Sequence, residues 1–192
     1  EKIFNNVGSA AILMDINNGE ILSMLSMPDF DLNKREKITD KIYINRATKA
    51  IYELGSVFKT FTFTAGLNEN SIDVDSEFKN LEKRIRCGKN IISEYDEEIP
   101  ENITAEEILV RSGNIGSVRI AQKIGIEKFK SFLDKLGITE KIDFDIEEVG
   151  SPLPLTWGKC KLATSAFGHG ITTTALQLTK AYAIISNGGY LV

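Results

Sequence analysis

Two side chains three residues apart, Ser56 and Lys59, are the first pair in this sequence with the chemistry of a reaction. They lie where a glycine gives way to an apolar, helix-like run, "YELGSVFKTFTFTAGL". At a helix N-terminus, free backbone N–H groups and the helix dipole favour the negative charge of a serine nucleophile. A lysine one turn later projects from the same face, where a neutral amine can take the serine proton. The pattern predicts either this nucleophile and base or an ordinary helix cap with a lysine that reaches into solvent.

Spacing alone does not separate these two interpretations. Thirteen serines and 17 lysines in 192 residues give about one S-x-x-K match by chance, and a second match occurs at Ser76 and Lys79. The carboxylates around Lys79 should keep it charged, whereas a lysine acts as a base only when burial or nearby cations lower its pKa. Apolar neighbours that favour a lowered pKa surround Lys59, namely Val57, Phe58, Phe61 and Phe63. We therefore interpret Ser76 and Lys79 as the chance match.

Two further polar groups are candidates for a site. Ser112 and Asn114 form an S-x-N pattern, which chance also produces about once in a chain of this composition. His169 is the only histidine, and the sequence lacks the G-x-S-x-G elbow of a serine for which it could act as base. We expect His169 to have a structural or cleft-lining role.

The remaining polar clusters predict structure rather than chemistry. Asn45 and Arg46 precede the Ser56 stretch and are expected to organise a loop, and Lys159 and Lys161 are expected on a solvated face. The acidic run "EYDEEIPEN" indicates a solvated loop. No cluster of carboxylates and histidine has metal-ligand spacing, so we predict no metal and no cofactor.

Composition limits the class of protein. At 192 residues, with 42% hydrophobic and 26% charged residues, the chain has the size and composition of one globular domain and is short for two. A net charge of −4 gives no basic surface for nucleic acid. No stretch approaches the roughly 18 apolar residues of a membrane span, and no signal peptide opens the chain. The sequence starts close to a strand and stops where another is expected, which favours an excised piece of a longer protein.

The two cysteines, Cys87 and Cys160, form no C-x-x-C motif, so a zinc knuckle or a thioredoxin-like site is not predicted. A single disulfide would require an oxidising compartment. Because nothing in the sequence brings the two thiols together, we favour a reduced pair.

Local patterns predict a strand hairpin followed mainly by helices. Apolar runs at 10–14 and 21–27 flank Asn17-Asn18-Gly19, which suits a tight turn, and their nearly continuous apolar character predicts strands buried on both faces. Helices are expected from residue 56 to about 69, from the capping-box spacing of Thr104 and Glu107, before Gly125 and Gly137, and at the end of the chain. Residues 71–103 lack a sustained period. This order predicts an α+β fold, an antiparallel sheet flanked by helices.

Four blocks in this order resemble the transpeptidase domain of class B penicillin-binding proteins, most closely the division-specific peptidoglycan D,D-transpeptidase of Gram-negative bacteria. They are "GSAAILMDINNGEILSMLSMPDFDLN", "INRATKAIYELGSVFKTFTFTAGL", "ITAEEILVRSGNIGSVRIAQKIG" and "GHGITTTALQLTKAYAIISNGG". The resemblance covers essentially all 192 residues as one partial transpeptidase domain, and it is weak at 71–100 and 138–160. It implies the α+β fold that penicillin-binding proteins share with serine β-lactamases.

The resemblance also implies residue roles. Ser56 would attack the carbonyl between two D-alanines of a peptidoglycan stem peptide, with its own backbone N–H as one half of the oxyanion hole. Lys59 would be its base, Ser112 would pass a proton to the leaving amine, and Asn114 would hold the lysine and the substrate backbone. An amine of a second stem peptide would then take the acyl group, and β-lactams would acylate the same serine. A membrane anchor, a pedestal domain, a periplasmic active site and division-complex partners are implied for the whole protein.

One departure from the family pattern stands out. The third family motif, Lys-Thr-Gly on an inner strand, does not occur, and in the family it follows the helix that here ends at Gly188-Gly189. Its absence would remove the second oxyanion donor, the strand that pairs with substrate and a cation near Lys59, and further sheet strands would be missing too. We therefore expect a chain truncated before this motif.

Two other functions remain open. A β-lactam hydrolase or sensor of the same superfamily would release the acyl group quickly. Class A β-lactamases use a glutamate in a loop past the S-x-N motif for this, and "IEEVGSPLPLTWG" shows no clear equivalent. A non-catalytic scaffold of the division complex is favoured only by the missing third motif, and the sequence that follows Val192 would discriminate it.

The missing motif generates a first prediction. Because half of the expected oxyanion hole is absent, we expect the isolated 192-residue chain to be acylated by a labelled penicillin slowly or not at all. Acylation of the isolated chain at a rate similar to that of the full-length protein would contradict this prediction.

Overall fold

The computed structural model describes residues 8–34, 41–158 and 160–192. The chain forms two compact units. The first unit consists of Glu1–Tyr52, Leu136–Leu153 and Thr172–Val192, and the second of Glu53–Lys135 and Pro154–Ile171. Each unit mixes helices with short strands, which confirms the predicted α+β class. The assignment of 1–192 to one partial transpeptidase domain stays a prediction.

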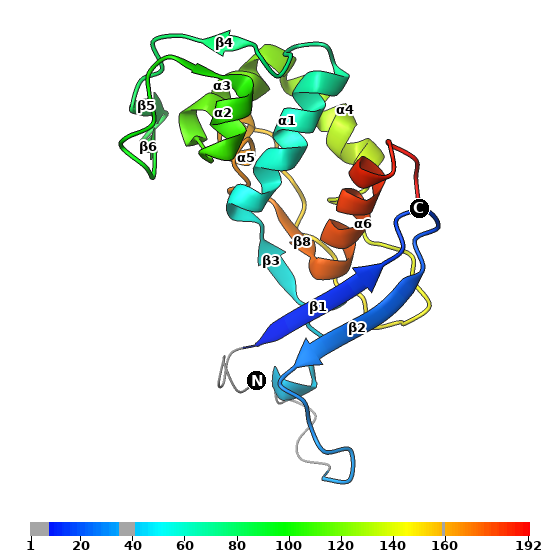
Figure 1. Cartoon of the computed structure of the whole chain (residues 1–192). Coiled ribbons are helices and arrows are strands. Elements are labelled where there is room, and N and C mark those ends of the chain that lie inside the picture. Colours follow the sequence, from blue (N-terminus) through cyan, green and yellow to red (C-terminus); the bar gives the residue numbers. More distant parts are fainter. Residues whose placement is uncertain (1–7, 35–40, 159) are drawn as a thin grey trace. The chain divides into compact units, whose positions relative to one another are not determined.

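The first unit contains the predicted hairpin. Strands β1 (Ser9–Met14) and β2 (Ile21–Met27) pair antiparallel, and Gly19 adopts the positive φ of 76° that the turn requires. Helix α6 (Ala175–Ser186) packs against β1 (Figure 1). The unit also contains η1 (Lys41–Tyr43) and most of a small sheet in which β3 (Ile51–Glu53) pairs with β8 (Thr172–Thr174).

The prediction that both hairpin strands are buried on both faces is wrong. Leu13 and Leu22 are each 58% exposed and Leu25 is 51% exposed, and burial alternates along β1. The reason is the period of two along a strand, which sends successive side chains to opposite faces while α6 packs on this hairpin from one side. A nearly continuous apolar run does not by itself show that both faces are covered.

The second unit is mainly helical. Its helices are the short η2 (Gly55–Phe58), α1 (Lys59–Asn68), α2 (Ala105–Val110), α3 (Asn114–Ile124), α4 (Ile126–Leu136) and α5 (Lys161–Ser165). Helix α1 packs against α2 and α3 (Figure 1). The unit also contains two small antiparallel sheets. In one, β4 (Glu77–Phe78) pairs with β7 (Ile103–Thr104), and in the other, β5 (Arg84–Cys87) pairs with β6 (Asn90–Ser93).

The sequence predicts a single antiparallel sheet. Within the described residues of both units, the strands instead form four separate two-stranded sheets.

Aromatic packing holds the segment that carries Ser56 and Lys59. The predicted stripe of Phe58, Phe61 and Ala65 is fully buried. The Phe58 ring lies 5.5 Å from that of Phe61 and meets Phe129 edge-on at 6.3 Å, and Phe129 in turn meets Trp157 edge-on at 6.4 Å. These contacts fix the first turns of α1 to α4 and to the loop before α5.

Helix boundaries follow the local signals. Thr104 and Glu107 form the predicted capping box, and α3 and α4 are followed by Gly125 and Gly137, both at positive φ. The start of α6 has a second capping box, formed by Thr174 and Gln177. None of the helices among the described residues has the length and apolar character needed to cross a membrane.

Cys87 and Cys160 form a disulfide, so the prediction of a reduced pair is wrong. Their Cα atoms lie 5.6 Å apart although 73 residues separate them in sequence. Only the tertiary fold brings them together, because the turn of the β5–β6 hairpin meets the residue before α5. The bond ties the hairpin to the start of α5.

Two smaller predictions have different outcomes. Asn45 organises its loop as predicted, since its side chain accepts from the N–H of Ala47 and its carbonyl accepts from that of Lys49. Lys161 lies at the surface but is not fully solvated, because it is half-buried and its Nζ donates to the carbonyl of Gly170 at 2.6 Å. Lys159 lies outside the described residues.

The aromatic cluster generates a prediction about stability. Phe58→Ala removes a fully buried ring at the centre of the cluster, and we expect it to lower the free energy of unfolding by about 3–5 kcal/mol. Val110→Ala is the control, because Val110 is 77% exposed and its truncation should change stability by less than about 0.5 kcal/mol. Chemical denaturation monitored by circular dichroism measures both, and equal losses would contradict the prediction.

Candidate active site

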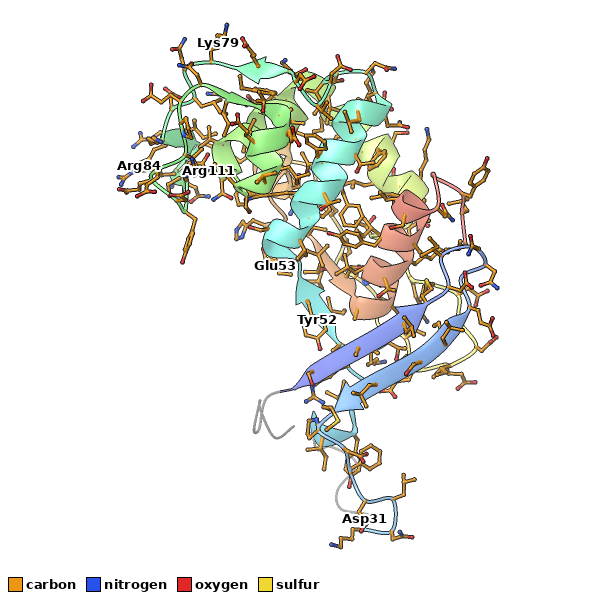
Figure 2. All side chains as sticks on the ribbon, viewed as in Figure 1. Asp31, Tyr52, Glu53, Lys79, Arg84 and Arg111 are labelled. Atoms are coloured by element: carbon orange, nitrogen blue, oxygen red, sulfur yellow. A yellow bond between two sulfur atoms is a disulfide. The ribbon has the colours of Figure 1, made fainter. Side chains whose placement is uncertain are left out.

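A cleft of about 460 Å³ lies within the second unit and contains all four predicted site residues. Ser56, Lys59, Ser112 and Asn114 line it together with seven other residues: Glu53, Gly55, Tyr95, Asp96, Arg111, Phe167 and His169. Figure 2 labels Glu53 at the end of β3 and Arg111 just after α2. The residues come from four separate stretches of the chain, which only the fold brings together.

Ser56 lies in the first turn of the helical segment, as predicted, and is exposed. Gly55 before it has a φ of 57°, which glycine adopts without strain, and this residue turns the chain from β3 into η2. The carbonyl of Ser56 accepts from the backbone N–H of Lys59. Since side chains three residues apart nearly eclipse in such a tight turn, Ser56 and Lys59 project from the same face.

Lys59 is 97% buried, with an exposed fraction of only 3%. Its Nζ donates three hydrogen bonds, to the carbonyl of Ser112 at 2.5 Å, to Ser112 Oγ at 3.0 Å and to Asn114 Oδ1 at 2.7 Å. Burial lowers the pKa of Lys59 to about 8, and the negative charge of Glu94 acts against this by raising it. The predicted lowering of the Lys59 pKa is confirmed, and its cause is desolvation.

The second S-x-x-K pair has the opposite environment. Lys79 is exposed and pairs with Glu77 at 2.7 Å, and this hydrogen bond raises the pKa of Lys79. The hydroxyl of Ser76 accepts from the backbone N–H of Asp73 and so caps a turn. In Figure 2 Lys79 lies on the loop that carries β4, away from Glu53 and Arg111. This environment agrees with the interpretation of the pair as a chance match, which stays a prediction.

Ser112 has an unusual backbone conformation, with a φ of 55°. It follows the end of α2 in a Schellman motif: the N–H of Ser112 donates to the carbonyl of Leu109, and that of Gly113 donates to the carbonyl of Ile108. Glycine is the usual residue at this position, and a serine there costs about 1 kcal/mol or more in backbone strain. The strained turn directs both the carbonyl and the hydroxyl of Ser112 at Lys59.

Asn114 begins α3 and is held on three sides. Its Oδ1 accepts from Lys59, its Nδ2 donates to the carbonyl of Ser93 at 2.9 Å, and its backbone N–H donates to Glu94 Oε2 at 2.6 Å. The other carboxylate oxygen of Glu94 accepts from the N–H of Ile115 at 2.8 Å. Glu94 thus caps a helix whose N-cap, Gly113, has no side chain for this purpose.

The acidic run is a mostly exposed loop, as predicted, but Glu94 and Asp96 within it make specific contacts. Both are partly buried, and Asp96 pairs with Arg111 at 2.8 Å. No spacing rule marks Glu94 in the sequence, because it lies 20 residues before the helix that it caps. A capping residue this far from the helix start can be identified only once the fold is known.

The rim of the cleft carries a histidine and a carboxylate. His169 Nδ1 lies 2.9 Å from Glu53 Oε1, and the imidazole stacks on Phe167 at 6.3 Å with an interplanar angle of 16°. The backbone N–H of Gly170 also donates to Glu53. The prediction that His169 lines a cleft is confirmed.

The arrangement is suited to activating a hydroxyl. A buried lysine with a pKa of about 8 is partly neutral near neutral pH, and only the neutral amine accepts a proton. Ser56 projects on the same side, and Ser112 provides a second hydroxyl bonded to the amine. No group of three or more potential metal-binding side chains occurs in the described part of the chain. The catalytic roles of Ser56, Lys59, Ser112 and Asn114 stay predictions.

Comparisons with known proteins show which proteins this chain resembles. A family model described as the penicillin binding protein transpeptidase domain matches residues 9–192. The chain is 32% identical to "Probable peptidoglycan D,D-transpeptidase FtsI" of Caulobacter vibrioides, over 97% of this chain and 31% of that protein. It is 31% identical to "Stage V sporulation protein D" of Bacillus subtilis, over 96% of this chain and 29% of that protein. The chain therefore spans about a third of the length of these relatives.

Solved structures show the same fold. A peptidoglycan glycosyltransferase from Burkholderia ambifaria superposes with a TM-score of 0.78 at 20% identity, over 93% of this chain and 52% of that one. The transpeptidase domain of penicillin-binding protein 3 from Burkholderia pseudomallei also gives a TM-score of 0.78 at 20% identity, over 94% and 50%. At this identity the likeness establishes the fold alone.

The electrostatics of the cleft generate a prediction. Because the charge of Glu94 raises the pKa of Lys59, Glu94→Gln should lower that pKa below its value of about 8. Glu97→Gln, a change in an exposed residue of the same loop, should leave it unaltered. NMR titration of the full-length protein with 13C-labelled lysines measures both, and a Lys59 that titrates near 10.5 in the unsubstituted protein would contradict the assigned environment.

Proposed function

This chain belongs to the penicillin-binding protein transpeptidase family, and on that premise we propose that the protein is a peptidoglycan D,D-transpeptidase of septal cell-wall synthesis. The observation that carries the proposal is the buried Lys59 amine, bonded to Ser112 and Asn114 in a cleft that Ser56 also lines. The substrates are two peptidoglycan stem peptides, one that donates an acyl group and one that accepts it. β-Lactams act on the same serine.

In the first half of the reaction Ser56 attacks the carbonyl between the two terminal D-alanines of the donor. The hydroxyl proton passes to the neutral Lys59 amine, and the Ser56 N–H stabilises the developing oxyanion. The peptide C–N bond then breaks. The leaving D-alanine amine takes a proton through the Ser112 hydroxyl, which is bonded to Lys59, so the lysine returns to its neutral form. The product is an ester of Ser56.

In the second half an amine of the acceptor peptide attacks this ester. A new amide bond forms, the amine gives up a proton to Lys59, and the Ser56 oxygen leaves and is reprotonated. The hydrogen bond from Lys59 to Asn114 Oδ1 supports both halves because it fixes the amine in one place. The reaction is a balanced exchange of one amide for another through an ester.

The same proposal includes a location. We place the site on the periplasmic face of the inner membrane, held there by an anchor elsewhere in the protein, where division-complex proteins are its partners. The Cys87–Cys160 disulfide supports this location, because disulfides persist in oxidising compartments such as the bacterial periplasm.

The proposal predicts which of the two S-x-x-K pairs matters. In the full-length protein Ser56→Ala should abolish covalent labelling by a fluorescent penicillin. Lys59→Arg should slow it by about 100-fold or more, because arginine stays charged and cannot act as a base. The matched controls Ser76→Ala and Lys79→Arg should label normally, since that pair is exposed and Lys79 is held charged by Glu77.

The lysine also predicts a pH dependence for the same reaction. Only its neutral form accepts the serine proton, so the acylation rate should rise with pH and level off above about 8. Stopped-flow acylation rates across pH 6 to 10 measure this. Rapid release of the bound penicillin would instead favour a β-lactam hydrolase, and labelling of Ser56→Ala would refute the assigned nucleophile.

A further inference from the structure

A second hollow of about 420 Å³ lies beside the cleft, within the same compact unit. One wall is β6, Asn90–Ser93, and the other consists of Thr164, Phe167 and His169. Asn114, Phe167 and His169 line both hollows, whereas Ser56 and Lys59 line only the cleft. The second hollow therefore leads to the reacting groups without containing them.

The register of the β5–β6 hairpin shows which backbone groups face outward from it. The N–H of Glu94 donates to the carbonyl of Lys83 at 3.2 Å, which makes Lys83–Glu94 a bonded pair that continues the ladder. Bonded and non-bonded pairs alternate in an antiparallel ladder, which makes Arg84–Ser93 and Arg86–Ile91 non-bonded pairs. The backbone N–H and C=O groups of Ile91 and Ser93 consequently point away from β5.

Contacts at this edge agree with the register. The carbonyl of Ser93 accepts from Asn114 Nδ2, which lies on the side away from β5. Ile91 is 60% exposed, and in the described part of the chain β6 pairs with no strand other than β5. An open strand edge with backbone groups directed into a hollow is a template for an extended peptide.

The Cys87–Cys160 disulfide links the two elements that form the walls of the hollow. Cys87 lies at the turn of the hairpin opposite Asn90, and Cys160 directly precedes α5. Helix α5 and the turn after it provide the opposite wall, where the N–H of His169 donates to the carbonyl of Thr164 at 3.1 Å. The two walls are thus joined covalently near one end.

We propose that this hollow binds the acceptor stem peptide as an additional strand on the edge of β6. The proposal rests on the transpeptidase function proposed above. The donor must place its carbonyl at Ser56, so a site that adjoins Asn114 but lacks Ser56 and Lys59 fits the second reactant. A peptide paired with the N–H and C=O of Ile91 extends along β6 toward Asn114. Its free amine then reaches the ester of Ser56 from the side of the second hollow.

The test separates acceptor binding from acylation. Ile91→Pro removes the outward N–H of β6 and leaves the bonded pairs with β5 intact, as proline allows on an edge strand. Arg86→Pro is the matched control, because it removes the equivalent outward N–H on the opposite edge of the same hairpin. The probe is a synthetic stem peptide with a free side-chain amine, and its affinity for each full-length variant is measured by isothermal titration calorimetry.

We expect Ile91→Pro to weaken peptide binding about fivefold, the effect of one lost hydrogen bond, and Arg86→Pro to leave it unchanged. Thr164→Tyr, which fills the hollow from the helical wall without altering a strand, should weaken binding at least as much. Labelling by a fluorescent penicillin should proceed normally in all three variants, which also shows that they are folded.

The outcomes distinguish this proposal from the function on which it rests. Equal peptide affinities in the unsubstituted protein, Ile91→Pro and Thr164→Tyr would overturn the acceptor site, even where penicillin labelling is normal. Peptide binding that weakens in these two variants supports the acceptor site. If the unsubstituted protein bound the peptide in this way but was not labelled by penicillin, the hollow would remain a peptide-binding site, whereas the proposed enzymatic function and the acceptor role that rests on it would fail.

Discussion

The burial of one ammonium group, that of Lys59, is the constraint on which the rest of the second unit depends. Removing a charge from water is costly unless oxygen atoms replace the lost hydration. Three acceptors do so here, and all of them belong to Ser112 and Asn114. The end of α2 and the start of α3 must therefore meet α1 at one point. The strained φ of Ser112 is explained by this requirement, because a relaxed turn would direct its carbonyl elsewhere.

Opposing effects set the proton affinity of this amine. Burial favours the neutral form, and the carboxylate of Glu94 favours the charged form. The same carboxylate caps α3 and so holds Asn114 in place. Helix capping and proton affinity are thus coupled through one side chain. Without Glu94, Lys59 would lose its proton more readily and the side-chain amide of Asn114 would be held less firmly. The basicity of Lys59 and the position of Asn114 therefore cannot be optimised separately.

Features that depend on neighbours in sequence were predictable. The hairpin turn at Gly19, the stripe of Phe58 and Phe61, and the capping box of Thr104 all follow from patterns a few residues long. Features that depend on the tertiary fold were not. Glu94 lies 20 residues from the helix it caps, and Cys87 lies 73 residues from its partner. The exposure of one face of the β1–β2 hairpin was also not predictable, because an apolar run in the sequence does not show which of its side chains other elements cover.

The two S-x-x-K pairs show why a motif acquires meaning only from its surroundings. Lys59 and Lys79 have the same spacing from a serine, yet the pKa of the first is lowered and that of the second is raised. The aromatic cluster that buries one and the carboxylate that pairs with the other decide the difference. The role of Asn114 also follows from its surroundings, because it contacts Lys59 and lines both the cleft and the second hollow. A residue that fixes the base and borders a second binding surface connects proton transfer with the arrival of the second reactant, so its position constrains both halves of the proposed reaction.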